Sequence, residues 1–148
     1  MDPTPCVVFD VDGTLADATH RLHFLAHSPK KWDEFFSCMD VDPVIEPVAA
    51  IARAFRGRTH LVCVSARPQR TASSTKAWMK KHDLNYWHAY YFREDGDRRD
   101  DQLVKKDILD RMLLDGWRPF LVFDDRQRVV DMWRANGIVC AQVAPGDF

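Results

Sequence analysis

The chain carries the stretch Cys-Val-Val-Phe-Asp-Val-Asp-Gly-Thr-Leu at residues 6–15, where a continuous apolar run ends in two aspartates and a glycine. A run that is apolar at every position is typical of a strand buried on both faces of a parallel sheet. In open sheets of this kind, ligands bind beyond the carboxyl ends of the strands. The stretch therefore predicts a buried strand at residues 6–10 that delivers Asp10 and Asp12 to a site at that edge.

Four more β-like runs follow, and segments with helical periodicity separate the strands. The runs cover residues 60–65, 88–92, 120–124 and 139–143, and apolar residues recur at helical spacing over residues 44–55, 103–113 and 129–134. Strands that alternate with helices form mostly parallel sheets between helical layers. We therefore expect an α/β fold, a three-layer Rossmann-like parallel sheet of about five strands with helices on both faces.

Residues 17–42 interrupt this alternation with a segment rich in aromatic and basic residues, including Trp32, Phe35 and Phe36. We interpret the segment as a small helical cap over the strand ends. A plain crossover helix with a longer loop is the alternative. With 148 residues, the chain is expected to form one domain over residues 1–148.

The composition is that of an ordinary globular protein, with 46% apolar and 29% charged residues. No apolar run is long enough to cross a bilayer, and no basic region precedes an apolar one at the N-terminus, so we expect a cytoplasmic protein without a membrane partner. The formal net charge of −1 excludes a strong basic field over the whole surface. It does not exclude a local basic groove for a nucleic-acid strand. Such a groove could be formed by Lys30, Lys31, Arg67, Arg70, Lys76, Lys80 and Lys81, which could also be an ordinary solvated helix face.

The four cysteines are expected to be free, reduced thiols. Cys6, Cys63 and Cys140 lie inside short apolar runs, where a thiol behaves as a small hydrophobic group. The sequence contains no Cys-x-x-Cys pair, which argues against structural zinc.

Groups able to handle a phosphate follow several of the predicted strands. The second strand ends in Ser65-Ala66-Arg67, the fourth ends in Asp124-Asp125-Arg126, and Lys105 and Lys106 begin the helix before the fourth strand. Converging carboxylates repel one another unless a hard cation joins them, and oxygen ligands suit Mg²⁺. A serine, a lysine and the amides around Gly13 can then surround the oxygens of a phosphoryl group.

Asp10 and Asp12 together allow hydrolysis in two steps. One carboxylate attacks phosphorus and forms an acyl phosphate, while the other protonates the leaving oxygen and later deprotonates water. Each motif alone also has an ordinary structural interpretation, such as a turn, a helix cap or a solvated helix face. Their joint appearance at successive strand ends favours the catalytic interpretation.

Residues 10–14, Ser65, a downstream lysine and Asp124-Asp125 resemble, in order, the four motifs of the haloacid dehalogenase superfamily. The resemblance implies that Asp10 is the nucleophile and Asp12 the acid and base. It also implies that Mg²⁺ is bound by Asp10, the backbone carbonyl of Asp12, and Asp124, with Asp125 beside them.

A narrower resemblance is to the phosphatase domains of bacteriophage polynucleotide kinase–phosphatases, on residues 65–67, 98–101, 124–133 and 142–148. It implies removal of a 3′-phosphate from nucleic-acid ends or nucleoside 3′-phosphates, as in DNA and RNA repair. By this resemblance Lys105 is the motif lysine beside Ser65, although a loop longer by one residue leaves Lys106 open. The implied substrate contacts are Gly13, Thr14, Arg21, Arg67 and Asp100. No P-loop is present, so the chain carries no kinase half of that type.

Two alternatives remain at this stage. One is a 5′-nucleotide or small-metabolite phosphatase of the same superfamily. Residues 17–42 are expected to select the substrate and so to decide between this function and a 3′-phosphatase. The other is a non-catalytic module that binds phosphorylated ends, against which the intact Asp10, Asp12, Ser65 and Asp124 argue. The sequence leaves open whether the protein forms a homo-oligomer.

Overall fold

The computed structural model describes residues 2–146. Residues 1, 147 and 148 of the predicted domain therefore lie outside the described part, and the last two of them also belong to the stretch 142–148 named above. Its centre is a five-stranded sheet with parallel neighbours in the order β3-β2-β1-β4-β5. The strands are β1 (Thr4–Phe9), β2 (His60–Pro68), β3 (Ala89–Arg93), β4 (Trp117–Asp124) and β5 (Val139–Gln142). The predicted α/β fold with about five parallel strands is confirmed.

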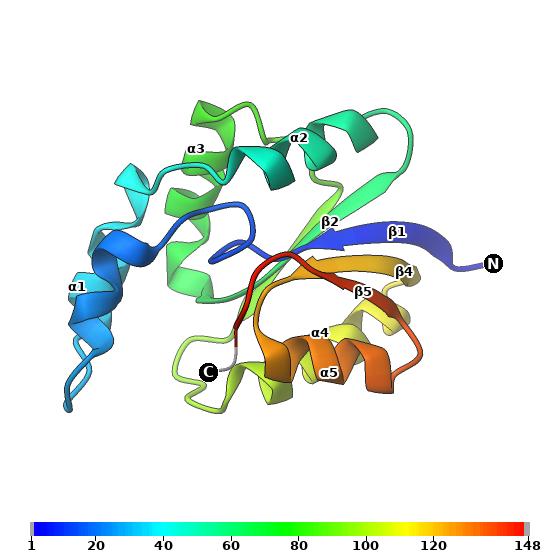
Figure 1. Cartoon of the computed structure of the whole chain (residues 1–148). Coiled ribbons are helices and arrows are strands. Elements are labelled where there is room, and N and C mark those ends of the chain that lie inside the picture. The colour runs from blue at the N-terminus through cyan, green and yellow to red at the C-terminus, as the bar shows by residue number, and fades with distance from the viewer. Residues whose placement is uncertain (1, 147–148) are drawn as a thin grey trace.

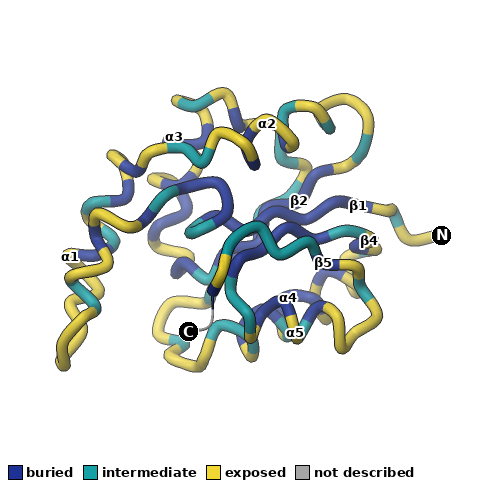
Figure 2. Tube along the Cα trace, viewed as in Figure 1, coloured by how far each residue is buried: buried dark blue, intermediate teal, exposed yellow. Residues whose placement is uncertain are grey.

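Helices on both faces of the sheet explain the continuous apolar run of β1. Val7 and Phe9 belong to the core that includes residues of α2 (Glu46–Phe55) and α3 (Ala72–Lys81). Cys6 and Val8 belong to a second core with residues of α4 (Asp101–Leu114) and α5 (Gln127–Ala135). Figure 1 shows these helix pairs above and below the sheet, and Figure 2 shows β1 buried over most of its length.

The fourth strand begins earlier than the apolar pattern predicts, at Trp117 instead of residue 120. Pro119 has no N–H to donate, which usually keeps proline out of inner strands. Here it precedes Leu121, the first residue of β4 that pairs with β5, and the β1–β4 register shifts between Cys6 and Val7. The strand therefore tolerates the proline at its start.

The segment 17–42 folds into short helical turns: η1 (Thr19–Leu25), α1 (Trp32–Ser37) and η2 (Met39–Val41). At its base the Asp17 N–H donates to the Pro43 carbonyl at 2.8 Å. Figure 1 shows the segment at the left, beyond the carboxyl ends of the strands. A further short helical turn, η3 (Gln69–Thr71), joins β2 to α3.

All four cysteines are free, and three of them, Cys6, Cys63 and Cys140, are buried as expected. Burial raises the pKa of the Cys63 thiol to about 12, so this group stays protonated at neutral pH. None of the described helices has the length and apolar character needed to span a bilayer.

Candidate active site

Asp10, just after β1, and Asp124, at the end of β4, share one buried lysine. Lys105 Nζ donates to Asp10 Oδ1 and to Asp124 Oδ2, at 2.8 Å in each case. The lysine is 2% exposed and Asp124 is 1% exposed, so these ion pairs form where water screens them little. The Lys106 side chain is 41% exposed and pairs with Asp110 instead. Of the two lysines that the sequence leaves open, Lys105 is the one at the cluster.

Asp125 completes a cluster of three buried carboxylates. Asp10, Asp124 and Asp125 each offer an oxygen, and these oxygens lie within 4.8 Å of one another. The Asp124 side chain is fixed further, since its Oδ1 accepts the Asp125 N–H at 2.9 Å. Asp10 and Asp125 directly follow β1 and β4, Asp124 ends β4, and Lys105 lies in α4.

Burial and mutual repulsion set the protonation of this cluster. Burial, and then the charge of Asp124, raise the pKa of Asp10 well above its usual value, while Lys105 opposes the shift. The same two causes raise the pKa of Asp125 to about 6. Burial alone would lower the pKa of Lys105, but Asp10 and Asp124 together raise it, so the lysine stays charged. If all three carboxyls were ionised, their charge would exceed that of the single lysine, and the raised pKa values of Asp10 and Asp125 reflect this repulsion.

Gly13 lies directly against the cluster. Its φ of +83° is in the left-handed region, and a Cβ built on it would lie 2.1 Å from Asp125 Oδ2. Both the backbone conformation and the close approach therefore require glycine here. Its N–H donates to the Ala16 carbonyl at 2.8 Å, which closes the turn after β1.

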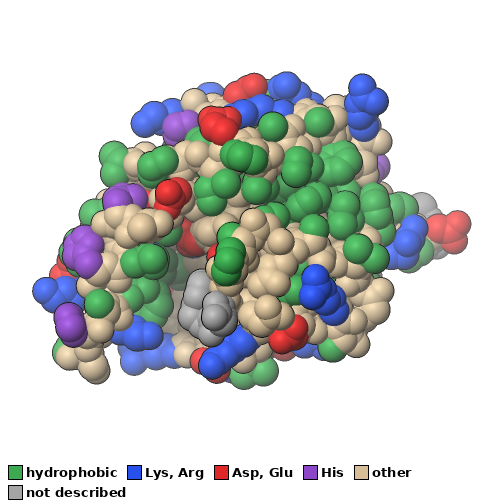
Figure 3. Space-filling view, viewed as in Figure 1, with side chains coloured by type: hydrophobic (Ala, Val, Ile, Leu, Met, Phe, Trp, Pro, Cys, Tyr) green, Lys and Arg blue, Asp and Glu red, His purple; other side chains and the backbone are tan. Residues whose placement is uncertain are grey.

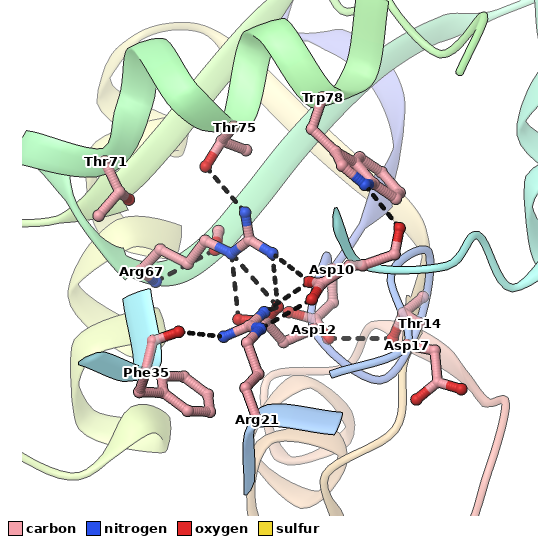
Figure 4. Close-up of polar contacts among 12 residues, drawn as sticks. Asp10, Asp12, Thr14, Asp17, Arg21, Phe35, Arg67, Thr71, Thr75 and Trp78 are labelled. Carbon is pink, nitrogen blue, oxygen red and sulfur yellow. Dashed lines mark hydrogen bonds and ion pairs between the residues drawn. The ribbon is translucent and has the colours of Figure 1, made fainter. Parts of the chain in front are cut away.

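Asp12 faces a different set of groups from Asp10. Its Oδ1 accepts Arg21 Nη2 at 2.7 Å and Arg67 Nη2 at 2.6 Å, and Arg67 Nε lies 3.1 Å from Oδ2 (Figure 4). Burial opposes ionisation of Asp12, but Arg67 and then Arg21 outweigh it and lower its pKa to about 2. The Asp12 carboxyl is therefore ionised at neutral pH and held by both arginines.

The two arginines are buried, and both also contact a second aspartate, Asp42. Arg21 is 0% and Arg67 2% exposed. Asp42, at the end of the segment 17–42, accepts Arg21 Nε at 2.8 Å and Arg21 Nη2 at 2.7 Å, and Arg67 Nη2 lies 3.4 Å from it. The sequence reasoning missed Asp42, because a single aspartate before a proline reads as an ordinary turn residue.

The remaining predicted site residues lie at different distances from the cluster. Thr14 Oγ1 donates to Asp10 Oδ2 at 2.9 Å, so it contacts the predicted nucleophile. Ser65 is buried, and its Oγ accepts the Arg67 N–H at 3.1 Å. Asp100 is exposed and pairs with Arg128 at 3.9 Å, so no described contact joins it to the cluster. Their predicted roles toward substrate remain predictions.

Asp101, beside Asp100, pairs with two arginines of neighbouring elements. Asp101 Oδ1 accepts Arg93 Nη2 at 2.6 Å and its Oδ2 accepts Arg126 Nη1 at 2.5 Å. These bonds join the N-terminus of α4 to the ends of β3 and β4. Two adjacent aspartates in a charged loop gave no sequence signal to separate Asp100 from Asp101.

The basic residues considered for a groove differ in burial and in their partners. Arg67 is buried at the site, whereas Arg70 is exposed and pairs with Asp33. Lys30 lies over the Trp32 ring, and Lys76 lies over the Tyr90 ring. Figure 3 shows the surface hollowed between the segment 17–42 and the rest of the domain, with acidic side chains inside the hollow.

The donor set at the cluster fits Mg²⁺. Three buried carboxylates lie within 4.8 Å, and Mg²⁺ prefers oxygen ligands and binds through a few carboxylates plus phosphate and water. The Asp12 side chain is bound to arginines, which leaves its backbone carbonyl as the group that the resemblance assigns to the metal.

Comparisons with known proteins match nearly the whole chain. A family model described as the polynucleotide kinase PNKP phosphatase domain matches residues 4–148. Two solved structures of a Pnkp1/Rnl/Hen1 complex, one of them described as an RNA repair complex, are similar to this chain, with TM-scores of 0.81 and 0.83 and 26% identity. The matches cover 99% of this chain but 44% and 48% of those chains, so it spans less than half their length.

More distant structures share the fold. A haloacid dehalogenase-like hydrolase from Streptococcus pneumoniae matches with a TM-score of 0.62 and 13% identity, over 95% of this chain and 84% of the other. A structure described as a predicted phosphatase from Clostridium acetobutylicum matches with a TM-score of 0.66 and 14% identity, over 95% and 85%. At these identities the likeness shows the fold alone.

Proposed function

Because this chain belongs to the polynucleotide kinase PNKP phosphatase-domain family, of haloacid dehalogenase type, we propose that it removes the 3′-phosphate from nucleic-acid ends or nucleoside 3′-phosphates. The family makes the chain a phosphatase. The finer parts of the proposal are the 3′ substrate, the need for Mg²⁺ and an aspartyl-phosphate intermediate on Asp10.

The observation that carries the proposal is the buried cluster at the carboxyl edge of the sheet. Asp10 lies within 4.8 Å of two other carboxylates, and Lys105 and Thr14 each donate to one of its oxygens. A carboxylate held in this way is oriented before substrate arrives, which is the condition for nucleophilic catalysis. Bound by Asp10, Asp124, Asp125 and the Asp12 carbonyl, Mg²⁺ would neutralise charge on the cluster and on the phosphoryl oxygens.

In the first step, an oxygen of Asp10 attacks phosphorus and the bond from phosphorus to the ester oxygen breaks. The leaving oxygen takes a proton from the Asp12 carboxyl. In the second step, water attacks the aspartyl phosphate and gives its proton to Asp12, and the bond between phosphorus and Asp10 breaks. Lys105 stays charged beside Asp10 in both steps.

In the substrate-free protein Asp12 is ionised, so it must lose part of its contact with the arginines and take up a proton from water before it can protonate the leaving oxygen. Its pKa of about 2 reflects Arg67 and Arg21 in the substrate-free protein. A phosphate that enters the site competes for the same guanidinium donors, which bind phosphate and carboxylate with similar geometry. We infer that substrate binding and the readiness of Asp12 as an acid are coupled through these arginines.

Nucleic-acid ends are favoured as substrate by the family and by the described complexes of the similar structures, one of which is an RNA repair complex. We propose that the segment 17–42 acts as a cap that selects the substrate, since it supplies Arg21 and closes one side of the hollow in Figure 3. A 5′-nucleotide or metabolite phosphatase remains the competing function.

The deciding experiment compares oligonucleotides that differ only in carrying a 3′- or a 5′-phosphate, assayed in Mg²⁺ and in EDTA. We expect release of phosphate from the 3′ end, loss of activity in EDTA, and no turnover by Asp10→Asn. Cleavage of 5′-phosphates at an equal rate would reject the 3′ assignment. Full activity of Asp10→Asn would reject Asp10 as the nucleophile.

A matched pair of arginine variants tests the substrate contact. Arg67 is buried at the site, whereas Arg70, three residues later, is exposed. Arg67→Ala should lower activity strongly and Arg67→Lys should restore little, because an ammonium does not reproduce the planar paired donors of a guanidinium. Arg70→Ala should act like wild type on a mononucleotide, and equal losses in the two alanine variants would contradict the assignment.

A further inference from the structure

Asp42 and Asp12 bind the same two arginines. Arg21 Nη2 lies 2.7 Å from Asp12 Oδ1 and 2.7 Å from Asp42 Oδ2. Arg67 Nη2 lies 2.6 Å from Asp12 and 3.4 Å from Asp42. One nitrogen of each guanidinium is thus shared between two carboxylates, as Figure 4 shows for Asp12.

The two carboxylates differ in access to solvent. The Asp42 side chain is 0% exposed, whereas the Asp12 side chain is 30% exposed. An anion that enters from solvent can therefore replace Asp12 at the shared nitrogens without reaching Asp42. Asp42 also binds Arg21 through a second nitrogen, Nε, at 2.8 Å, which makes a bidentate pair.

Asp42 is itself held in place by three other elements. Trp78 of α3 donates from Nε1 to the Asp42 carbonyl at 2.9 Å, and the Asp42 N–H donates to the Met39 carbonyl at 3.1 Å. His20 Nε2 lies 2.6 Å from Asp42 Oδ1.

The guanidinium groups of the two arginines have further contacts. Arg67 Nη1 donates to Thr75 at 3.0 Å, and the Arg21 guanidinium lies 4.3 Å from the centre of the Phe35 ring.

From this arrangement we propose that Asp42 is a positioning residue, which holds Arg21 and Arg67 so that their shared nitrogens point to the open side and meet the oxygens of the substrate. Asp12 occupies those donors only until substrate binds. Asp42 touches neither the substrate nor the reacting atoms. The inference rests on the proposed function, because it takes the two arginines as the substrate contacts.

The test compares Asp42→Asn with Asp40→Asn, an exposed aspartate two residues away. Steady-state rates on a 3′-phosphorylated oligonucleotide should show KM raised about 10- to 100-fold in Asp42→Asn, with a smaller change in kcat, since misplaced binding groups weaken binding before chemistry. Asp40→Asn should stay within about twofold of wild type. A KM for Asp42→Asn within twofold of wild type overturns the proposal.

A second variant separates positioning from simple charge balance and guards against misfolding. Asp42→Glu keeps a negative charge beside both arginines but moves it by one methylene. We expect KM to stay raised about tenfold in this variant, with a urea midpoint close to that of wild type. Recovery of the wild-type KM would mean that the arginines need only a nearby charge, which rejects the positioning role.

A double-mutant cycle gives a readout that a general loss of stability would not produce. In an Arg21→Ala, Arg67→Ala background, Asp42→Asn should change KM by less than about twofold, because its partners are gone. An added tenfold loss there rejects the proposal. If wild-type protein ignores the 3′-phosphate but cleaves p-nitrophenyl phosphate, the proposed substrate is wrong, and the same cycle on that ester still decides the role of Asp42.

Discussion

Replacing Lys105 by methionine tests the electrostatics of the cluster most directly. The ammonium makes two 2.8 Å contacts with buried carboxylates. Without this positive charge, the oxygens of Asp10, Asp124 and Asp125, which lie within 4.8 Å of one another, have no cation between them to reduce their repulsion. Breaking a buried ion pair by removing one partner costs about 3–5 kcal/mol of unfolding free energy. For a chain of this size, that corresponds to a fall in Tm of roughly 10 °C.

The assay is urea unfolding in EDTA at pH 7, with Lys106→Met as the matched control. Lys106 makes an exposed pair with Asp110, which is worth about 0.5 kcal/mol or less. The loss in Lys105→Met should shrink at pH 5, because the pKa of Asp125 is already about 6 and protonation removes part of the repulsion. Equal unfolding free energies for the two variants, or a loss that grows toward pH 5, would refute this reasoning.

Three further predictions concern single residues around Asp10. Because the pKa of Asp125 is raised to about 6, its charge opposes folding above that pH and ceases to do so as the pH falls toward 4. Asp125→Asn should therefore raise the urea midpoint of the metal-free protein at pH 7 while lowering activity. An unchanged midpoint would contradict the repulsion. Gly13→Ala should cost about 2 kcal/mol more than Gly96→Ala in urea unfolding, because both have positive φ but only Gly13 has an atom within 4 Å of the added Cβ. Asp12→Asn should lower the rate by about 10²–10⁴ on a nucleoside 3′-phosphate and by less on p-nitrophenyl phosphate, and equal losses on both would point to a role other than acid catalysis.

Much of the fold follows from periodicity alone. The run at residues 6–10 predicts β1, although the strand begins two residues earlier and ends one residue earlier, because a strand buried on both faces leaves no polar position in its central part. The start of β4 was placed three residues late, since Arg118 and Pro119 break the apolar pattern. Those residues are tolerated because they lie before the part of β4 that pairs with β5.

The site divides into a part that sequence reasoning reaches and a part that it does not. Asp10 and Asp124 are marked by their place at strand ends, and the structure brings them together. The choice between Lys105 and Lys106 depends on the direction of a side chain from a helix, which adjacent identical residues do not reveal. Asp42 could not be predicted from the sequence for another reason. Its role depends on contacts with Arg21 and Arg67, which are 21 and 25 residues away in the chain.

The central position of β1 has a consequence for how the protein folds. The strand pairs with β2 on one side and with β4 on the other, and the bond from Lys105 to Asp10 spans 95 residues. Contacts of such long sequence separation form late, because closing long loops costs chain entropy before the contacts reward it. A partly folded chain that has β1, β2 and their helices already contains Asp10 and Asp12, yet it lacks the groups that β4 and α4 bring. Catalytic competence should therefore appear only when α4 and the last strands of the sheet have formed.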